Sequence, residues 1–508
     1  MAAQRHLLGP ALSLALALAA AGPGAAETLP GYGGRIRATL LGEPVHLDPI
    51  AARTHAEVTV IGLVFDTLYE LDGRDSSGRA RVVPRLAAAA PIPAEDGLSV
   101  RIPLRAGLRF HDGRPVGADD VVASLTRLRA GDAGWVISAV RSAERVGDAE
   151  LRLRLTWPMP PDALALALTA PTTAITPRGQ PPQAGAPIGS GPFRVERVER
   201  KRGRLLLTAH DDHLAGRPYV DAVELSWFEG GNREAAAYEI GALTLSQRGA
   251  VAYPDHHPKY ETREAAGPAT VLVYVGVGRR GPLTSRAARR ALSLALERDG
   301  LRGIGTGERV VPAEQPVPAA IGGAPLARSA RRARMDEARR ALAQAVRDDP
   351  RLAELSGPGH DRVVEILVDR SRPDDREIAE KVAAALFRLG VAARITAEPA
   401  PAFARRVGRG DGDLYIGQLV LPAPAPALAW AAAFAAGADD WAATRLARGP
   451  LDLAAAARAF AARLPIVPLA HRAVRVHHRS DLRGVALDDS ARLPFADLFF
   501  FGRPVPHR

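Results

Sequence analysis

Two short runs of histidine and aspartate have residue types that could do chemistry. His210-Asp211-Asp212-His213 offers two imidazoles three positions apart beside two carboxylates, which are ligands that zinc and nickel accept. His111-Asp112 has the types of a general-base pair, in which a carboxylate orients an imidazole. Gly113 follows that pair and supplies the positive φ of a tight turn, so a purely structural role stays open.

The stretch Gly276-x-Gly278-x-x-Gly281 has the spacing of a dinucleotide-binding fingerprint. It lies between an expected strand at 271–275 and an expected helix at 284–298, and Glu297 lies about 20 residues on. Pro282 delays that helix beyond the last glycine, so a pyrophosphate would not lie on the helix N-terminus. We therefore expect no cofactor.

The elements around His111-Asp112 are the clearest in the chain. Leu98, Val100, Ile102 and Leu104 alternate with other residues, which predicts a half-buried strand. After the turn, Asp119 or Asp120 is expected to cap a helix with one apolar stripe. Further strands and helices alternate along residues 363–396, which predicts a parallel α/β unit.

Composition narrows the class of protein. The chain has 508 residues, enough for two or more cores, and a formal charge of +11 that is almost entirely arginine. Nucleic-acid binding would need a basic face interleaved with stacking aromatic residues, but only 5% of the residues are aromatic. We expect no nucleic-acid partner.

Residues 1–26 have the pattern of a secretory signal peptide, with a basic start, an apolar run at 7–21 and small residues at Gly24-Ala25-Ala26. The apolar run is too short to span a bilayer comfortably. The sequence has no cysteine, so a lipid-anchored cysteine is impossible. These features predict a periplasmic protein, cut near Ala26 and without a lipid anchor.

Three motifs together resemble the solute-binding proteins of ABC importers, in the dipeptide-, oligopeptide- and nickel-binding family (family 5). The first is Leu104-Arg105-x-Gly107 leading into Phe110-His111-Asp112-Gly113 and on to Ser124. The second motif is the glycine-rich run at 187–193. The third is the run at 464–469, which begins Leu464-Pro465-Ile466. The resemblance runs from about residue 35 to about 485, and it implies that 111–113 and 210–213 are structural turns.

The resemblance implies an α/β fold of two lobes with mixed sheets, of the class II periplasmic-binding-protein type. Lobe I would comprise 27–267, with an inserted subdomain at about 78–186; lobe II would comprise 268–470, and 471–508 would return to lobe I. The expected function is capture of a small molecule or peptide between the lobes, by a monomer that delivers it to an ABC permease and ATPase complex at the inner membrane. A degenerate sensor or docking protein and, less favoured, an exported enzyme with a nonlocal triad are the alternatives.

In peptide-binding relatives, a G-W-x-x-D-x-x-D-P motif supplies an aspartate for the ligand's α-ammonium, because a buried cation needs an ionic partner. The corresponding run from Gly417 to Pro426 lacks both the tryptophan and the carboxylates. We therefore expect that this recognition is lost or moved, with Glu43 or Asp48 next in line, and that ordinary dipeptides bind weakly. The candidate ligand contacts are Tyr415, Gln418, Trp430, Tyr274 and Arg279.

Overall fold

The computed structural model describes residues 31–76, 79–179, 186–247, 257–279, 282–302, 304, 310–324, 326–355 and 362–501. The expected signal peptide and Gly281 lie outside this part of the chain. Within it, no helix is long and apolar enough to cross a membrane.

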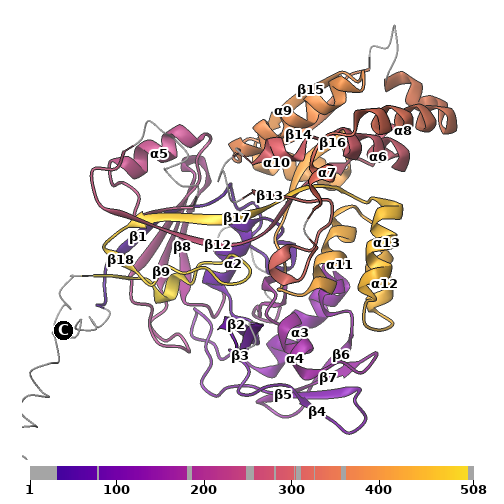
Figure 1. Ribbon diagram of the computed structural model, residues 1–508. Coiled ribbons are helices and arrows are strands. Elements are labelled where there is room, and N and C mark those ends of the chain that lie inside the picture. The colour runs from indigo at the N-terminus through magenta and orange to yellow at the C-terminus, as the bar shows by residue number, and fades with distance from the viewer. Residues whose placement is uncertain are drawn as a thin grey trace, which may run out of the picture.

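One curled mixed sheet extends through most of the molecule (Figure 1). Its strands follow one another in the order β15 (Ala393–Glu398), β14 (Val364–Asp369), β16 (Leu414–Leu419), β12 (Thr262–Val277), β17 (Val467–Arg479), β11 (Leu245–Ser246), β1 (Arg35–Thr39), β10 (Ala222–Ser226), β9 (Arg204–Ala209) and β8 (Phe193–Glu199). The short strand β13 (Val310–Pro312) pairs with β17 beside this path.

The central strands β12 and β17 pair antiparallel from Thr262 opposite Arg479 to Val275 opposite Val467. Residues 261–270 include Gly267-Pro268 and would suit a linker by composition, but the first half of β12 occupies them. Pro268 has no N–H for the ladder, and the register shifts between Ala266 and Ala269 around it. The shift accommodates the proline without ending the strand.

Lobe I packs around β1, which runs parallel to β10 and β11. Helix α2 (His55–Val64) covers this sheet, and the chain returns to the same core at Leu482, Phe495 and Leu498. Helix α5 (Gly231–Glu239) lies at the edge of this body (Figure 1). The sequence predicted that α2 would continue to Tyr69, but it stops at Val64 and Tyr69 begins a strand.

A subdomain with its own core projects from lobe I (Figure 1). Its elements are β2 (Tyr69–Arg74), β3 (Ala80–Pro84), β4 (Ile92–Pro93), β5 (Ser99–Pro103), α3 (Ala118–Ala130), β6 (Val140–Arg145), β7 (Glu150–Leu155) and α4 (Pro161–Ala167). Gly117 is the N-cap of α3, and Asp120 accepts the Gly117 N–H at 2.9 Å from the third helical position. The expected cap at Asp119 or Asp120 is therefore wrong by two or three residues.

In lobe II, helices cover both faces of the sheet half formed by β14, β15, β16 and the end of β12. One face packs against α6 (Arg286–Ala295), α8 (Met335–Asp348) and α9 (Pro373–Arg388). The other face packs against α10 (Ala400–Arg409), α11 (Pro426–Ala436), α12 (Trp441–Leu446) and α13 (Leu453–Arg463). β14 is parallel to β15 and β16, as the strand–helix–strand order predicted.

Glycines in β12 and β16 make room for tyrosines on the neighbouring strand. Tyr274 lies opposite Gly417 in register, and Tyr415 lies opposite Gly276. A Cβ at Gly276 would lie 2.0 Å from the ring of Tyr415, and one at Gly278 would lie 1.9 Å from the Gly412 carbonyl. Close packing therefore explains the first two glycines of the supposed dinucleotide fingerprint, and α6 begins only at Arg286.

Replacing Gly276 with alanine should destabilise the protein by about 1 to 3 kcal/mol, because the added methyl group overpacks a site whose ring is fixed. Gly62 is the matched control: it lies in α2, and a Cβ there would meet nothing within 4 Å. Gly62→Ala should be neutral or slightly stabilising. Denaturant unfolding of both variants would measure this, and equal midpoints would contradict the packing argument.

Candidate functional site

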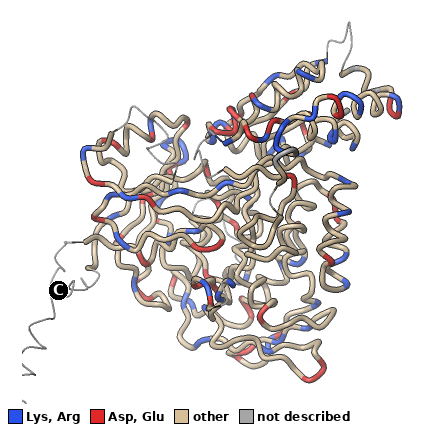
Figure 2. Tube along the Cα trace, viewed as in Figure 1, with Lys and Arg blue, Asp and Glu red and all other residues tan. Residues whose placement is uncertain are grey.

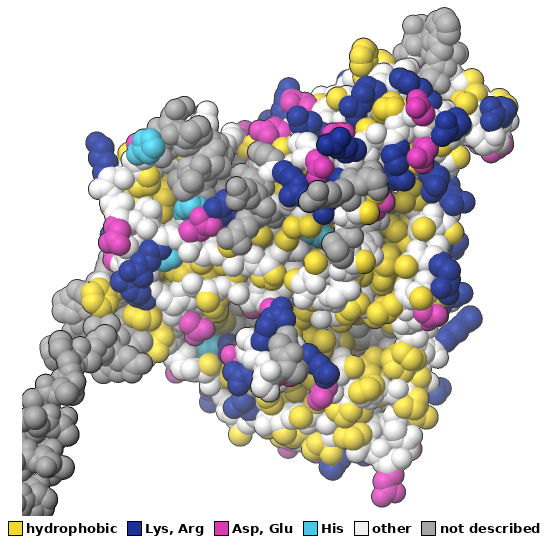
Figure 3. All heavy atoms as spheres, in the orientation of Figure 1, with side chains coloured by type: hydrophobic (Ala, Val, Ile, Leu, Met, Phe, Trp, Pro, Cys, Tyr) yellow, Lys and Arg dark blue, Asp and Glu magenta, His cyan; other side chains and the backbone are white. Residues whose placement is uncertain are grey.

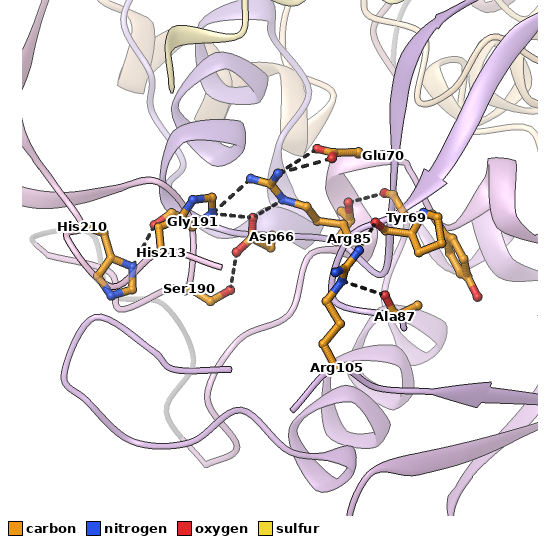
Figure 4. A network of polar contacts seen from close by, with 12 residues as sticks. Asp66, Tyr69, Glu70, Arg85, Ala87, Arg105, Ser190, Gly191, His210 and His213 are labelled. Carbon is orange, nitrogen blue, oxygen red and sulfur yellow. Dashed lines mark hydrogen bonds and ion pairs between the residues drawn. The ribbon is translucent and has the colours of Figure 1, made fainter. Parts of the chain in front are cut away.

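Both His-Asp motifs lie at the junction of lobe I and its subdomain. His210 Nδ1 lies 3.3 Å from the carbonyl oxygen of Gly191, and His111 Nε2 lies 3.0 Å from the same oxygen. His213 lies near Asp66, Arg85 and Ser190 in the polar network drawn in Figure 4. The expected turn at 210–213 is present, but both of its histidines point into the protein.

Arg85 is the centre of this network. Its Nε donates to Asp66 Oδ1 at 3.0 Å, and its Nη2 lies 3.0 Å from His213 Nε2. The same histidine nitrogen lies 3.4 Å from Asp66 Oδ1, so His213 Nε2 can accept from Arg85 or donate to Asp66, and either contact keeps it from binding a metal. Burial raises the pKa of the Asp66 carboxyl, but His213 and Arg85 outweigh it and hold the pKa below its usual range.

This arrangement favours a structural role for both motifs. Asp211 points elsewhere and accepts from Arg217 Nε at 2.8 Å. Among the described residues, no group of three or more His, Cys, Asp or Glu is placed to hold a metal ion. The network instead joins β2, β3 and the glycine-rich run at 187–193, where Ser190 donates to Asp66 at 3.0 Å.

Replacing Arg85 with methionine should cost about 3 to 5 kcal/mol, because Asp66 would be left as an unpaired buried charge. Arg81, in β3 just before Arg85, pairs with Asp72 on the exposed surface and is the control. Arg81→Met should change stability by less than about 1 kcal/mol. Denaturant midpoints at pH 7 would measure both, and similar values would show that the network does not hold the junction.

A second polar cluster lies where the two lobes touch, at the carboxyl end of β14. Ligands of open α/β sheets bind outside this end of the strands. The interlobe cluster comprises Asp369 at the end of β14, Arg372 before α9, Asp375 in the first turn of α9, and Gln418 in β16. From lobe I, the Glu43 backbone N–H donates to Ser371 Oγ at 3.0 Å. A Cβ at Gly42 would lie 3.0 Å from Arg372 Cγ.

Arg372 is held by charge on one side and by an aromatic ring on the other. Its Nε lies 2.9 Å from Asp375 Oδ2 and 3.3 Å from Asp369 Oδ2. Its guanidinium carbon lies 5.3 Å from the centre of the Phe403 ring, a cation–π distance. Only 5% of its side chain is exposed. The charge is thus buried and paired, and its environment is rigid.

The pairing in this cluster is incomplete. Arg372 Nε and Nη2 and Asp375 Oδ2 are buried without a hydrogen bond, so the close Nε–Oδ2 contact lacks hydrogen-bond geometry. Gln418 Nε2 donates to the other oxygen of Asp375 at 3.0 Å. A buried polar atom without a partner is costly, and in native proteins it often marks a place where another molecule binds.

Three of the five predicted contact residues lie in or beside the interlobe cluster, but on opposite faces of the sheet, because Gln418 alternates with Gly417, which lies opposite Tyr274. Gln418 belongs to the cluster, and Tyr274 and Tyr415 form an edge-to-face pair with ring centres 6.1 Å apart beside Phe403. Trp430 instead packs on Phe460 in the helical core of lobe II, with ring centres 5.3 Å apart. Arg279 lies exposed beyond the end of β12.

The two carboxylates that the sequence favoured as substitutes are already paired. Glu43 accepts from Arg200 at 3.1 Å, and Asp48 binds both terminal nitrogens of Arg127 at 2.6 and 2.9 Å. Sequence reasoning missed Arg372 and Asp375. A signal was present, because Ser371-Arg372-Pro373-Asp374-Asp375 directly follows a buried strand and starts a helix.

Burial raises the pKa of Asp375 to about 6, although Arg372 opposes the shift. The pKa of an aspartate in the unfolded chain is about 3.9, so the folded state binds this proton more tightly. The stability that the bound proton adds is lost as the pH rises through about 6. Relative to Asp375→Asn, the wild type should lose about 2 kcal/mol between pH 4 and pH 6.5.

Denaturant unfolding of the ligand-free chain at the two pH values would measure this difference. The exposed Glu380, also in α9, gives the control variant Glu380→Gln, whose difference from the wild type should stay constant. A constant difference for Asp375→Asn as well would show that its carboxyl has an ordinary pKa.

The fold is the two-lobe fold found in periplasmic binding proteins. A dipeptide-binding protein from Pseudoalteromonas sp. SM9913, solved with Met-Leu, superposes with a TM-score of 0.76 at 16% identity, over 92% of this chain and 100% of that chain. The oligopeptide-binding protein AppA from Bacillus subtilis, solved with a nonapeptide, gives a TM-score of 0.74 at 18% identity, over 93% and 99%.

Residues 81–439 match the bacterial extracellular solute-binding proteins, family 5 (middle region), and the chain belongs to that family. In sequence, it is 27% identical to the oligopeptide-binding protein AppA of Bacillus subtilis over 291 residues, which cover 54% of this chain and 51% of that protein. The chain thus spans about half the length of the curated relatives it matches. The expected family and fold class are confirmed.

Proposed function

We propose that this chain is the solute-binding component of an ABC importer of the peptide-uptake type. It captures a small molecule or peptide between its lobes and presents the closed form to a membrane permease with its ATPase. The observation that carries the proposal is the interlobe cluster, in which Arg372 and Asp375 keep buried polar atoms free of hydrogen bonds. Tyr274, Tyr415 and Phe403 supply a rigid aromatic wall beside it.

Binding rather than catalysis is the proposed activity, because the buried histidines of lobe I already serve the network at the subdomain junction. The family is extracellular or periplasmic, and the pattern of residues 1–26 favours export to the periplasm with cleavage near Ala26. The proposed lobe boundaries at 267/268 and 470/471 fall within or beside the crossing strands β12 and β17.

The test is a thermal-shift screen of residues 27–508 against amino acids, peptides of two to five residues, sugars and the nickel–histidine complex. A ligand that binds the folded state alone raises the melting temperature. Small-angle scattering with the bound compound should then show a smaller radius of gyration, because binding favours the closed arrangement.

Arg372→Met should abolish both responses, whereas Arg376→Met should keep them. Arg376 lies one turn further along α9, is 65% exposed and pairs only weakly with Glu380. If no compound changes the melting temperature or the radius, the importer function is wrong, and a sensor or docking role takes its place.

A further inference from the structure

The interlobe cluster contains more carboxylates than cations. Among the described residues, the groups whose charges act on one another around Arg372 include the carboxylates Asp369, Asp375 and Glu57 and the cations Arg53, Arg372 and Arg472. Asp374 adds a fourth carboxylate, paired with Arg472 at 2.7 Å. By ion-pair distance, Arg372 is the shared cation of the two buried carboxylates Asp369 and Asp375, so these two negative charges have one cation between them. A cationic ligand group would complement them.

Of these carboxylates, only Asp375 has a fully buried oxygen without a hydrogen bond among the described residues. Asp369 Oδ1 accepts from the Ser371 N–H and hydroxyl, at 2.9 and 2.7 Å. Both oxygens of Glu57 accept backbone N–H groups of lobe I, at 2.8 to 3.0 Å. Asp375 Oδ2 has no hydrogen bond and is fully buried. The position for a ligand cation is thus beside Asp375.

The neighbouring guanidinium adds a second requirement. Arg372 Nη2 is a buried donor without a partner, on the residue that contacts Asp375. It needs an acceptor, which a ligand oxygen close to the cationic nitrogen would supply. The N-terminus of α9 carries the positive end of the helix dipole. A ligand oxygen is therefore favoured there over the ligand's cationic nitrogen.

We propose that Asp375 receives a protonated amine of the ligand while Arg372 Nη2 donates to a carbonyl or carboxylate oxygen next to that amine. This inference rests on the proposed function and names its ligand class: molecules with an α-amino carbonyl or α-amino carboxylate head. A free peptide N-terminus and a free amino acid share this chemistry. The amine recognition that the sequence predicts as lost or moved is then moved, from the run at 417–426, at the end of β16 and in the loop after it, to the first turn of α9.

The test is calorimetry on residues 27–508 at pH 7.5 with matched probes. These are Ala-Leu, N-acetyl-Ala-Leu, Ala-Leu amide and free L-leucine. The free amine should be required, so acetylation should weaken binding by at least about 30-fold, as expected when one member of a buried charged pair is removed. Amidation of the far end should have little effect. Stronger binding of L-leucine than of Ala-Leu would identify amino acids rather than peptides as the source of the head group.

Variants separate the roles of the two residues. Asp375→Asn should lose about 30-fold or more in affinity for the amine probe, while Glu380→Gln should bind like the wild type. Wild-type affinity should rise from pH 5 to pH 7.5, because Asp375 must be ionised to pair with the amine. The charged groups that act on Asp375 are Arg372, Asp369 and Arg472, and Gln418 bonds to it. Asp375→Asn should lose this pH dependence.

Three outcomes would overturn the inference. The first is equal affinity for the acetylated and the free-amine probe, and the second is wild-type affinity in Asp375→Asn. The third is that no amine probe binds, while a compound without an amine still raises the melting temperature and closes the lobes. In the last case, the proposed function stands and only the ligand class is wrong. Failure of every compound in the broader screen would instead remove the proposed function itself.

Discussion

The antiparallel pairing of β12 with β17 is the constraint on which the rest of the structure depends. The pair belongs to both lobes: β12 also bonds to β16 of lobe II, and β17 bonds to β11, next to β1 of lobe I. The register shifts between Ala266 and Ala269 and again before Val271, in the middle of the pair. Irregular ladders bend more readily than regular ones, so relative motion of the lobes would concentrate there.

The same pairing sets the position of the interlobe cluster. The register of β12 against β16 places Tyr274 over Gly417 and Tyr415 over Gly276. The two rings and Phe403 then form one wall against which Arg372 packs. Glycines at matched positions on the two strands thus leave room for the aromatic wall against which the Arg372 guanidinium packs. The arginines on the surface, by contrast, are interspersed with acidic residues over both lobes (Figures 2 and 3).

The sequence could predict the elements that depend on local periodicity. The strand at 98–104, the helix that ends before Gly390 and the parallel unit around it were all expected, because apolar spacing and end signals lie within each segment. Strand β6, in contrast, has no such local signal and is stabilised by pairing with β7 and not by its own propensity. The same holds for the first half of β12, because its partner strand lies 200 residues away in the sequence.

The site was less predictable, because its residues meet only through tertiary contacts. Gln418 could be found from the family motif that it interrupts, and Tyr415 from its place just before that motif, but nothing local shows that Asp375 bonds to Gln418. Trp430 was a reasonable candidate by type, yet an Ala-rich helix carries it into a core with Phe434 and Phe460. A buried charge is identified by its unpaired atoms, and these become visible only when the surrounding segments are assembled.

Incomplete pairing at the lobe contact would give a physical reason for the proposed ligand-dependent closure. In the closed form without ligand, the cluster is removed from water while Asp375 Oδ2 and Arg372 Nη2 make no hydrogen bond, which destabilises that form relative to a hydrated open one. A ligand that supplies both partners removes this cost in the closed form alone. Because a ligand can shift a conformational equilibrium only by its difference in affinity for the two states, these two unsatisfied groups are where that difference arises. If the cluster were fully hydrogen-bonded, the lobes would close without a ligand, and closure would no longer depend on ligand binding.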